Sequence, residues 1–408
     1  MRKPFAGIFV VCYLLYFLWS GLWAQTKDEL VHDLSTLIKF QTVTRDNEAN
    51  RVAMEWVVEE LAGLPVHVQW YESKEFPSVV ITSQKTTRPK ILLAGHMDVV
   101  PGTEESFQPK VEDGRLIGRG AYDMKMGIAA SLNIFKALGI DLTKYDVGLM
   151  LTADEEIGGF NGVKYLVEQG YGAGIVVMPD GGFDWNFETQ AKGVLWLEVT
   201  AEGKSAHGSR TWLGENAITK LARFLIMLEE DFAIEKESYS LLGLGGFGHF
   251  AKEKEPGDDY YTTVNIGTIE GGKATNQVPD LATATVDIRY TPKYTSDDML
   301  ARTVAKAELF DGIAVQEKIS GGSHFADTSN PLFVSFVAIA HEVAGIEVGE
   351  TKSHGASDAR FFSGKKIPTM VIAGKGGNHH AEGEWVDIAD YEQFYRVLLA
   401  WVKENGRK

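Results

Sequence analysis

The feature that most constrains the fold is a regular alternation of helix-like segments with short apolar runs. Between residues 27 and 182, amphipathic segments at 27–40, 49–61 and 125–138 alternate with apolar runs bounded by Gly, Asp and Pro. Short apolar runs separated by helices are typical of parallel sheets. The predicted strands lie at 78–81, 91–94, 147–152 and 175–178. We therefore predict an α/β fold with a mostly parallel central sheet flanked by helices.

The pattern changes near residue 190, where strands with alternating polarity appear. The strands expected there lie at 194–201, 262–269, 282–290 and 314–319, and the helices at 215–230 and 296–308. After residue 321 the α/β pattern returns, with a helix at 332–343, a strand at 369–372 and a helix at 390–403. We therefore expect an α+β domain at 190–320, inserted into an α/β domain formed by 25–189 and 321–408.

The composition limits the possible binding partners and the residue types that could bind a metal ion. The 408 residues include 40 Lys and Arg against 56 Asp and Glu, a net charge of −16. A nucleic acid or an anionic membrane needs a basic face, so neither is an expected partner. Cys12 is the one cysteine and lies in the N-terminal apolar stretch. A metal bound by the body of the protein must therefore use His, Asp and Glu.

The first 24 residues have the order of an export signal. Arg2 and Lys3 precede an uncharged run at 4–25 that contains the small residue Ala24. A retained membrane anchor is the alternative, because the run is nearly long enough to span a bilayer. In both cases the body would lie outside the cytoplasm, secreted, periplasmic or attached to the cell envelope, and it would contact a membrane only if the segment is retained.

Polar side chains follow the predicted strands at the edge where open parallel sheets bind ligands. They are His96 and Asp98 after 91–94, Asp123 before the helix at 125–138, Glu155 and Glu156 after 147–152, Asp180 after 175–178, and His379 and His380 after 369–372. Singly, each has an ordinary interpretation, such as a helix N-cap for Asp123. Two imidazoles and three carboxylates from this group make a complete ligand set for two metal ions without any thiolate.

A family resemblance rests on these residues and their neighbours. The motifs are His96-Met97-Asp98-Val99-Val100-Pro101, Gly118-Arg119-Gly120 followed by Asp123-Met124-Lys125, Asp154-Glu155-Glu156-Ile157-Gly158, Ala206-His207 with Gly214-Glu215-Asn216-Ala217, and His380-Ala381 before Glu384. Their order and spacing resemble the zinc exopeptidase family that contains acetylornithine deacetylase, succinyl-diaminopimelate desuccinylase, aminoacylase and the glutamate carboxypeptidases. The resemblance covers nearly all the chain after the N-terminal segment.

The resemblance implies two Zn²⁺ ions per subunit, with Co²⁺ or Mn²⁺ as possible substitutes. Family practice pairs His96 with Asp180 on one ion and Glu156 with His380 on the other, and Asp123 bridges both. Asp180 follows a proline where many relatives have Glu before proline, so it is the least certain ligand.

Two further residues near the ions have roles implied by the family. Asp98 matches a carboxylate that holds the far nitrogen of His96 and so fixes its tautomer. Glu155 matches the general base, which takes a proton from the attacking water and passes it to the leaving amine. Neighbouring glutamates can divide the ligand and base roles because adjacent side chains in a loop point in different directions.

The inserted domain resembles the family's lid and dimerisation domain. His207 matches a donor to the oxyanion at the scissile carbonyl, often supplied by the partner subunit of a homodimer. Arg289, Asn265 and Gly355 match positions that bind a substrate carboxylate. From the residues alone, His207 is equally an ordinary loop histidine, and Arg289 a member of an ion pair on a strand face.

Two histidines depart from the family pattern. His354, in Ser353-His354-Gly355, stands where the family usually has a small Gly-rich run, so it adds a polar group near the expected substrate carboxylate. His379 competes with His380 for the ligand position, and the following Ala381 and Glu384 favour His380. The roles of His354 and His379 stay open.

These features favour a secreted or envelope-attached hydrolase that cleaves an amide bond next to a free carboxylate. A small peptide is the first expectation for the substrate, which makes the protein a carboxypeptidase or dipeptidase. An N-acyl amino acid is the alternative, which makes it a deacylase. A non-catalytic amino-acid or peptide-binding protein is the alternative of a different class, and Glu155 beside a full ligand set argues against it, since binding alone needs no base.

Overall fold

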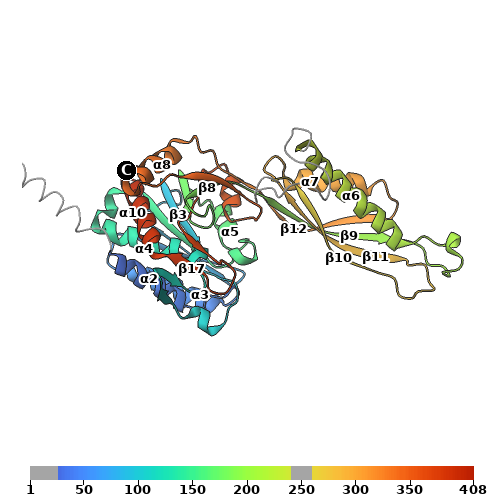
Figure 1. The fold of residues 1–408 in the computed structure, drawn as a ribbon, viewed down its shortest axis with the longest axis horizontal. Helices are drawn as coiled ribbons and strands as arrows, with labels where there is room; N and C mark the ends of the chain where they lie inside the picture. The colour runs from blue at the N-terminus through green and yellow to red at the C-terminus, as the bar shows by residue number, and fades with distance from the viewer. Residues whose placement is uncertain (1–25, 240–259) are drawn as a thin grey trace, which may run out of the picture. The chain divides into compact units, whose positions relative to one another are not determined.

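The computed structural model describes residues 26–239 and 260–408, and the predicted signal or anchor at 1–24, with Cys12, lies outside them. The chain divides into two compact units, which we describe separately (Figure 1). Unit 1 contains the described residues up to Phe187 together with Thr328–Gly349 and Ile367–Lys408. Unit 2 contains Glu188–Asp327 and also Glu350–Lys366, a segment that the sequence analysis assigned to the α/β domain.

The central sheet of unit 1 has six strands in the order β1-β2-β6-β3-β7-β15. Their bounds are β1 His67–Ser73, β2 Phe76–Thr82, β3 Ile91–His96, β6 Val147–Thr152, β7 Ile175–Met178 and β15 Thr369–Val371. Strands β6, β3, β7 and β15 run parallel to one another, as expected. Strand β2 runs antiparallel to both its neighbours, so the mostly parallel sheet that the sequence predicts is confirmed in part.

A tight hairpin explains the antiparallel strand. Ser73 of β1 pairs with Phe76 of β2, which leaves a connection of Lys74 and Glu75 alone. Both residues have positive φ angles, 45° and 75°. Two-residue connections with this backbone twist join antiparallel strands, and they usually contain Asn or Gly. The sequence has neither residue there, so the hairpin could not be predicted from its turn.

The helices of unit 1 begin at side chains that cap them. Their bounds are α2 Lys27–Lys39, α3 Asn47–Glu60, α4 Met126–Leu138, α5 Val163–Glu168, α8 Pro331–Ala344 and α10 Ile388–Asn405. Thr26 and Glu29 form a capping box on α2, and Asp46 caps α3. Helices α2, α4 and α10 contact one another, and α3 contacts β2. These contacts cover the sheet and leave the carboxyl ends of its parallel strands to the loops.

Helix α4 lies in the core of unit 1. In the described part of the chain, the stretch Ala121–Lys144 is the one helical segment long and apolar enough to cross a membrane, but 78% of its most apolar window is buried inside the protein. It includes the turn Ala121–Lys125, in which the Asp123-Met124 peptide is cis, α4, and the 3₁₀ turn Gly139–Lys144. Its apolar character is therefore that of a core helix.

Short elements complete unit 1 at the edge where the site lies. A four-stranded sheet has the order β16-β17-β5-β4, with the bounds β4 Lys110–Glu112, β5 Arg115–Ile117, β16 Gly376–Gly377 and β17 Trp385–Asp387. Short 3₁₀ turns lie at Glu104–Phe107 and Glu155–Ile157. The pairing of β17 with β5 joins the segment after residue 376 to the segment before Asp123.

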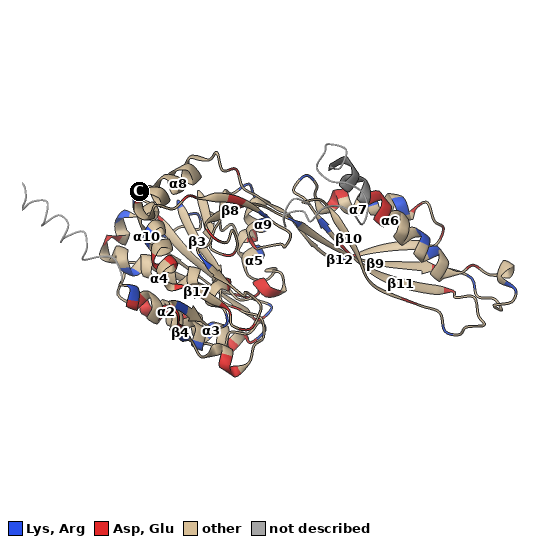
Figure 2. Ribbon diagram, viewed as in Figure 1, with Lys and Arg blue, Asp and Glu red and all other residues tan. Residues whose placement is uncertain are grey.

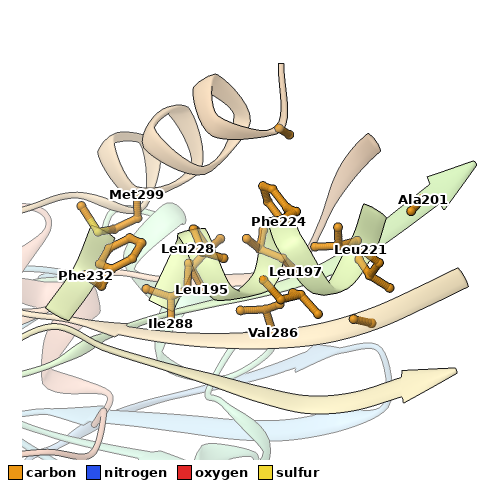
Figure 3. Close-up of a cluster of buried hydrophobic side chains, with 14 of the residues drawn as sticks. Leu195, Leu197, Ala201, Leu221, Phe224, Leu228, Phe232, Val286, Ile288 and Met299 are labelled. Atoms are coloured by element: carbon orange, nitrogen blue, oxygen red, sulfur yellow. The ribbon is translucent and has the colours of Figure 1, made fainter. Parts of the chain in front are cut away.

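Unit 2 is built on an antiparallel sheet in the order β10-β11-β9-β12. Its elements are β9 Gly193–Glu202, α6 Ala217–Tyr239, β10 Thr263–Gly271, β11 Leu281–Tyr290, α7 Ser296–Ala307 and β12 Ile313–Gly321. Side chains of β9 at 195, 197, 199 and 201 are buried while those between them are more exposed. Figure 3 shows Leu221, Phe224 and Leu228 of α6 in one buried cluster with side chains of β9, β11 and α7. The alternation thus places one sheet face against α6 and α7.

A smaller sheet and two charged helices also belong to unit 2. Strands β13 His324–Phe325, β8 Asn186–Ala191 and β14 Gly349–Ser353 form a three-stranded sheet, and the short helix α9 Ala359–Ser363 follows it. On α6 the basic residues Lys220 and Arg223 lie near its start and the acidic residues at 229–231 lie further along, and α7 carries residues of both signs (Figure 2).

Candidate metal centre

Four strand ends and one loop of unit 1 place the predicted residues together. Strand β3 ends at His96, β6 leads to Glu155 and Glu156, β7 leads to Asp180, and β15 leads through a loop to His380. Asp123 lies just before α4. Because β3, β6, β7 and β15 are parallel, their carboxyl ends meet at one edge of the sheet.

Asp123 lies between two imidazoles. Its Oδ1 is 3.2 Å from Nε2 of His96, and its Oδ2 is 3.0 Å from Nε2 of His380. The same His96 nitrogen is 3.7 Å from Oδ1 of Asp180, and the same His380 nitrogen is 3.0 Å from Oε2 of Glu156. Each oxygen of one carboxylate thus faces a different histidine, which is the arrangement expected of a bridging ligand.

Two groups of side chains could each hold a metal ion. The ligand atoms of His96, Glu155 and Asp180 lie within 4.8 Å of one another, and so do those of Asp123, Glu156 and His380. The structure therefore brings together all five predicted ligands and the predicted base. It also places Glu155 within ligand distance of His96 and Asp180, so its separate role as a base stays a prediction.

The donor atoms fit divalent cations. Nδ1 of His96 donates a hydrogen bond to the carbonyl oxygen of Asp98 at 2.9 Å, since a carbonyl only accepts. In the neutral ring Nε2 then carries a lone pair, and this buried atom has no hydrogen-bond partner among the described residues although carboxylate oxygens face it. A lone pair opposite carboxylate oxygens is repulsive unless a cation lies between them. Imidazole and carboxylate donors suit Zn²⁺, Mn²⁺ or Co²⁺.

The electrostatics of the cluster also favour cations. Contacts with the carboxylates of Asp123 and Glu156 raise the pKa of His380 to about 10. Burial alone would lower the pKa of His96, but Asp123, Asp180 and Asp98 outweigh it and raise that pKa well above its usual value. Burial raises the pKa of Asp180, and the neighbouring carboxylates add to this effect. The crowded negative charge is relieved by any bound cation, a proton or a metal ion.

Asp98 contacts both the histidine and the predicted base, but not in the way expected. Its carboxylate lies 3.5 Å from Nδ1 of His96, whose hydrogen bond goes to the Asp98 backbone instead. The carboxylate accepts hydrogen bonds from the backbone N–H groups of Glu155 at 3.2 Å and Glu156 at 3.3 Å, and from the hydroxyl of Thr44 at 3.0 Å. Asp98 therefore fixes the tautomer of His96 through its carbonyl and the turn at Glu155 through its side chain.

Sequence reasoning missed part of the support around Asp123. Lys125 is fully buried and its Nζ donates to the carbonyl oxygens of Leu37 and Phe40 at 2.9 and 3.0 Å. Glu384, noted only as part of a motif, is 2% exposed and accepts hydrogen bonds from the loop that bears Asp123. Apart from the side chain of Arg119, which contacts Glu384, their partners are backbone groups, which have no signature in the sequence.

The predicted substrate residues belong to unit 2 and are not part of this cluster. His207 is exposed, and its Nδ1 lies 2.8 Å from Oγ of Ser209. Nε of Arg289 donates to both carboxylate oxygens of Asp287 at 2.9 and 3.1 Å, which is the strand-face ion pair considered as the alternative. Asn265 and Gly355 are both exposed. Their roles in substrate binding stay predictions.

The two histidines of open role stand beside aromatic rings. The ring of His379 lies 5.0 Å from that of Phe183 and 5.9 Å from that of His380. In unit 2 the ring of His354 lies 5.7 Å from that of Tyr260. It is His380, and not His379, whose nitrogen contacts Asp123 and Glu156.

Comparisons with known proteins agree with this arrangement. A family model described as peptidase family M20/M25/M40 matches residues 92–404. The succinyl-diaminopimelate desuccinylase of Corynebacterium glutamicum is 29% identical over 338 residues, covering 80% of this chain and 84% of that protein. A probable carboxypeptidase of Aspergillus terreus is 31% identical over 339 residues, covering 78% and 72%. The structure of an M20 family metallo-carboxypeptidase from Sulfolobus solfataricus superimposes with a TM-score of 0.71 at 22% identity, covering 92% of this chain and 98% of that chain.

Proposed function

Because the chain belongs to peptidase family M20/M25/M40, we propose that it is a two-metal hydrolase that cleaves an amide bond next to a free carboxylate. Membership makes the chain a hydrolytic enzyme, and the family is a metal-dependent one. The observation that supports two ions is the position of Asp123, with one carboxylate oxygen 3.2 Å from His96 and the other 3.0 Å from His380. A single-ion site would need only one of these histidines.

The proposed ligands would divide between two ions. His96 and Asp180 would hold one ion, Glu156 and His380 would hold the other, and Asp123 would contribute to both. The chemistry that two divalent cations supply in such a site is activation of water at neutral pH and polarisation of the carbonyl. Zn²⁺ is the proposed native ion, with Co²⁺ or Mn²⁺ as substitutes that accept the same donors.

Glu155 is the proposed general base. Its backbone N–H is held by the carboxylate of Asp98, so the start of its side chain has a fixed position beside His96 and Asp180. From there it takes the proton of the attacking water and gives it to the nitrogen of the leaving amine, which must be protonated to depart. Asp98 contacts both His96 and the backbone of Glu155, and so fixes the position of the base relative to the histidine.

Residues of unit 2 are proposed to bind the rest of the substrate. His207 is exposed and offers its ring to the oxyanion that forms when water adds to the carbonyl. Arg289 has two nitrogens beyond the one that contacts Asp287, which is enough for bidentate contact with a carboxylate. Asn265 and Gly355 complete the proposed carboxylate site.

We propose an exopeptidase that acts on small peptides, with deacylation of N-acyl amino acids as the second candidate. One relative is named a desuccinylase and another a probable carboxypeptidase, so each class has support. The export signal read at 1–24 favours peptides, because small peptides are available outside the cell. The same sequence leads us to propose a secreted, periplasmic or envelope location, which mass spectrometry of the mature N-terminus would test.

A substrate screen tests the proposed function. The purified protein is stripped with chelator, reloaded with Zn²⁺, Co²⁺ or Mn²⁺, and given dipeptides, N-acetyl amino acids and N-succinyl amino acids. Metal-dependent turnover of dipeptides supports the exopeptidase, and preference for the acyl compounds supports the deacylase. Dipeptides with an amidated C-terminus serve as the control, since the proposal requires them to be poor substrates. Turnover that survives removal of metal would contradict the two-metal mechanism.

A further inference from the structure

Glu384 lies four residues after His380 and is buried, with 2% of its surface exposed. Its Oε1 accepts hydrogen bonds from the backbone N–H groups of Tyr122 and Asp123, both at 2.9 Å. Its Oε2 accepts from the backbone N–H of Gly120 at 2.9 Å and from Nη1 of Arg119 at 3.0 Å. Four donors from a single loop thus converge on the two oxygens of one carboxylate.

The same residue belongs to the loop that bears His380. The carbonyl oxygen of Glu384 accepts from the N–H of Gly118 at 2.8 Å, and the next residue, Trp385, pairs with Ile117 across β17 and β5. Glu384 is therefore joined to the Asp123 loop through its main chain and its side chain, and to His380 through four peptide units.

We propose that Glu384 is a positioning residue of the metal centre, whose carboxylate holds the peptide of Asp123 at a fixed distance from the loop of His380. The inference rests on the proposed two-metal function, because its consequence is the spacing of two ligands. Nε2 of His380 lies 3.0 Å from Oδ2 of Asp123, and Glu384 contacts the backbone N–H of Asp123. Through Asp123 the constraint reaches His96 as well, so both ions depend on it.

Chemistry explains why only a glutamate serves. An ionised carboxylate only accepts hydrogen bonds and has lone pairs for all four donors. Glutamine has the same length, but its NH₂ group would face one pair of N–H donors and repel it. Aspartate keeps the charge, but its shorter side chain cannot reach both sides of the loop. Glutamine therefore removes acceptor capacity, and aspartate removes the reach of the side chain.

Metal affinity is the measurement that separates positioning from a purely structural role. Zn²⁺ alone is titrated into chelator-treated wild type, Glu384→Gln and Glu384→Asp, in competition with a chromophoric chelator. We expect two ions in wild type and an affinity about 10- to 100-fold weaker in both variants, as for other residues that orient ligands. The matched control is Glu382→Gln, an exposed glutamate two residues away on the same loop, which should bind like wild type.

Kinetics and amide exchange complete the test. At saturating Zn²⁺, kcat of the variants should fall by about 100-fold while KM changes little, because a misplaced ligand affects the chemical step. Backbone amides of Gly120, Tyr122 and Asp123 should exchange with solvent faster in both variants than in wild type. Wild-type Zn²⁺ affinity in both variants, or unchanged exchange at those amides, would overturn the inference. A wild type that binds fewer than two ions would instead overturn the two-metal function, and amide exchange would still decide whether Glu384 holds the loop.

Discussion

Asp123 is the residue on which the candidate centre depends most, because its two oxygens contact different histidines. The sequence placed it at the start of a helix, where a capping aspartate is the commoner interpretation. In the structure the N-cap of α4 is Lys125 and not Asp123, and the carboxylate of Asp123 contacts His96 and His380 instead. At the scale of single residues, the contact and not the position in the helix identifies the candidate ligand.

Glu155 provides a prediction that separates a base from a ligand. Glu155→Gln keeps the size of the side chain but cannot accept a proton, so we expect kcat to fall by about 10² to 10⁴-fold. The number of Zn²⁺ ions bound should stay the same, measured by titration of the metal-free protein. Glu168→Gln, an exposed site on α5, is the control.

Two outcomes would contradict this assignment. Hydrolysis at the wild-type rate by Glu155→Gln would show that Glu155 takes no part in proton transfer. Loss of one bound ion in the same variant would show that Glu155 acts as a ligand, which its distance from His96 and Asp180 allows.

His324 provides a prediction for stability against pH. It is fully buried in unit 2, with Nδ1 at 2.7 Å from Oγ of Ser363 and Nε2 at 3.2 Å from the carbonyl oxygen of Glu188. Burial lowers its pKa from 6.5 to about 4. In the unfolded chain the imidazole of His324 binds a proton below about pH 6.5, whereas in the folded chain it does so only below about pH 4. The free energy of unfolding therefore falls as the pH falls from 6.5 to 4.

The size and test of this effect follow from the same values. Between pH 7 and pH 4 this effect should lower the free energy of unfolding of wild type by on the order of 3 kcal/mol. The His324→Gln variant should lack this part of the decrease. Urea unfolding at a series of pH values measures it, with the exposed His32→Gln as the control. Equal pH dependence in wild type and His324→Gln would contradict the prediction.

At the scale of elements, apolar periodicity located buried strands and helices well and exposed ones poorly. The run at 91–94 became β3 Ile91–His96, and the segment at 296–308 became α7 Ser296–Ala307. Strand β4 Lys110–Glu112 is exposed at all three positions, and its one apolar side chain, Val111, is too little to form an apolar run. Strand β1 His67–Ser73 was missed although it contains Val68, Trp70 and Tyr71, because its side chains are exposed or half-buried and mark no buried face. Without β1, the hairpin that reverses β2 could not be predicted.

The core between α6 and the sheet of unit 2 should respond to loss of volume. Leu221 is fully buried in the cluster that Figure 3 shows, so Leu221→Ala should lower the stability of unit 2 by about 2–5 kcal/mol through the lost contacts and the cavity. Ile226 lies on the same helix but is 54% exposed, so Ile226→Ala should change stability by less than about 0.5 kcal/mol.

Hydrogen exchange in urea at α6, β9 and β11 reports this change for unit 2 alone. Equal protection in the two alanine variants would show that the α6 packing does not stabilise the unit.

At the scale of the whole molecule, the sequence predicted the ligand set more fully than the support around it. Ligands are side chains at strand ends, and both the residue type and the position can be read from the chain. The four donors around Glu384 include three backbone N–H groups, and any residue type supplies those. The antiparallel strand and the extra segment Glu350–Lys366 in unit 2 likewise depend on contacts distant in sequence.

The homodimer that the family resemblance implies is the remaining prediction for the whole chain. Among the described strands of unit 2, β10 lies at the edge of the sheet and pairs with β11 alone. Its residues from Gly267 to Gly271 are exposed, including Ile269 at 51%. An exposed edge strand with apolar side chains tends to pair with another copy unless a charge blocks it. Wild type should therefore sediment at the mass of two chains, and Ile269→Lys should sediment as one chain.

Val111→Lys is the matched control, because Val111 is 62% exposed on β4 of unit 1 and should leave the mass unchanged. If His207 acts across the dimer, Ile269→Lys should also lower kcat/KM to the level of His207→Ala, because the monomer lacks the partner's imidazole. A monomeric Ile269→Lys variant with full activity would show that His207 either acts in the active site of its own chain or takes no part in catalysis. Wild type that sediments as a single chain at working concentration would contradict the homodimer itself.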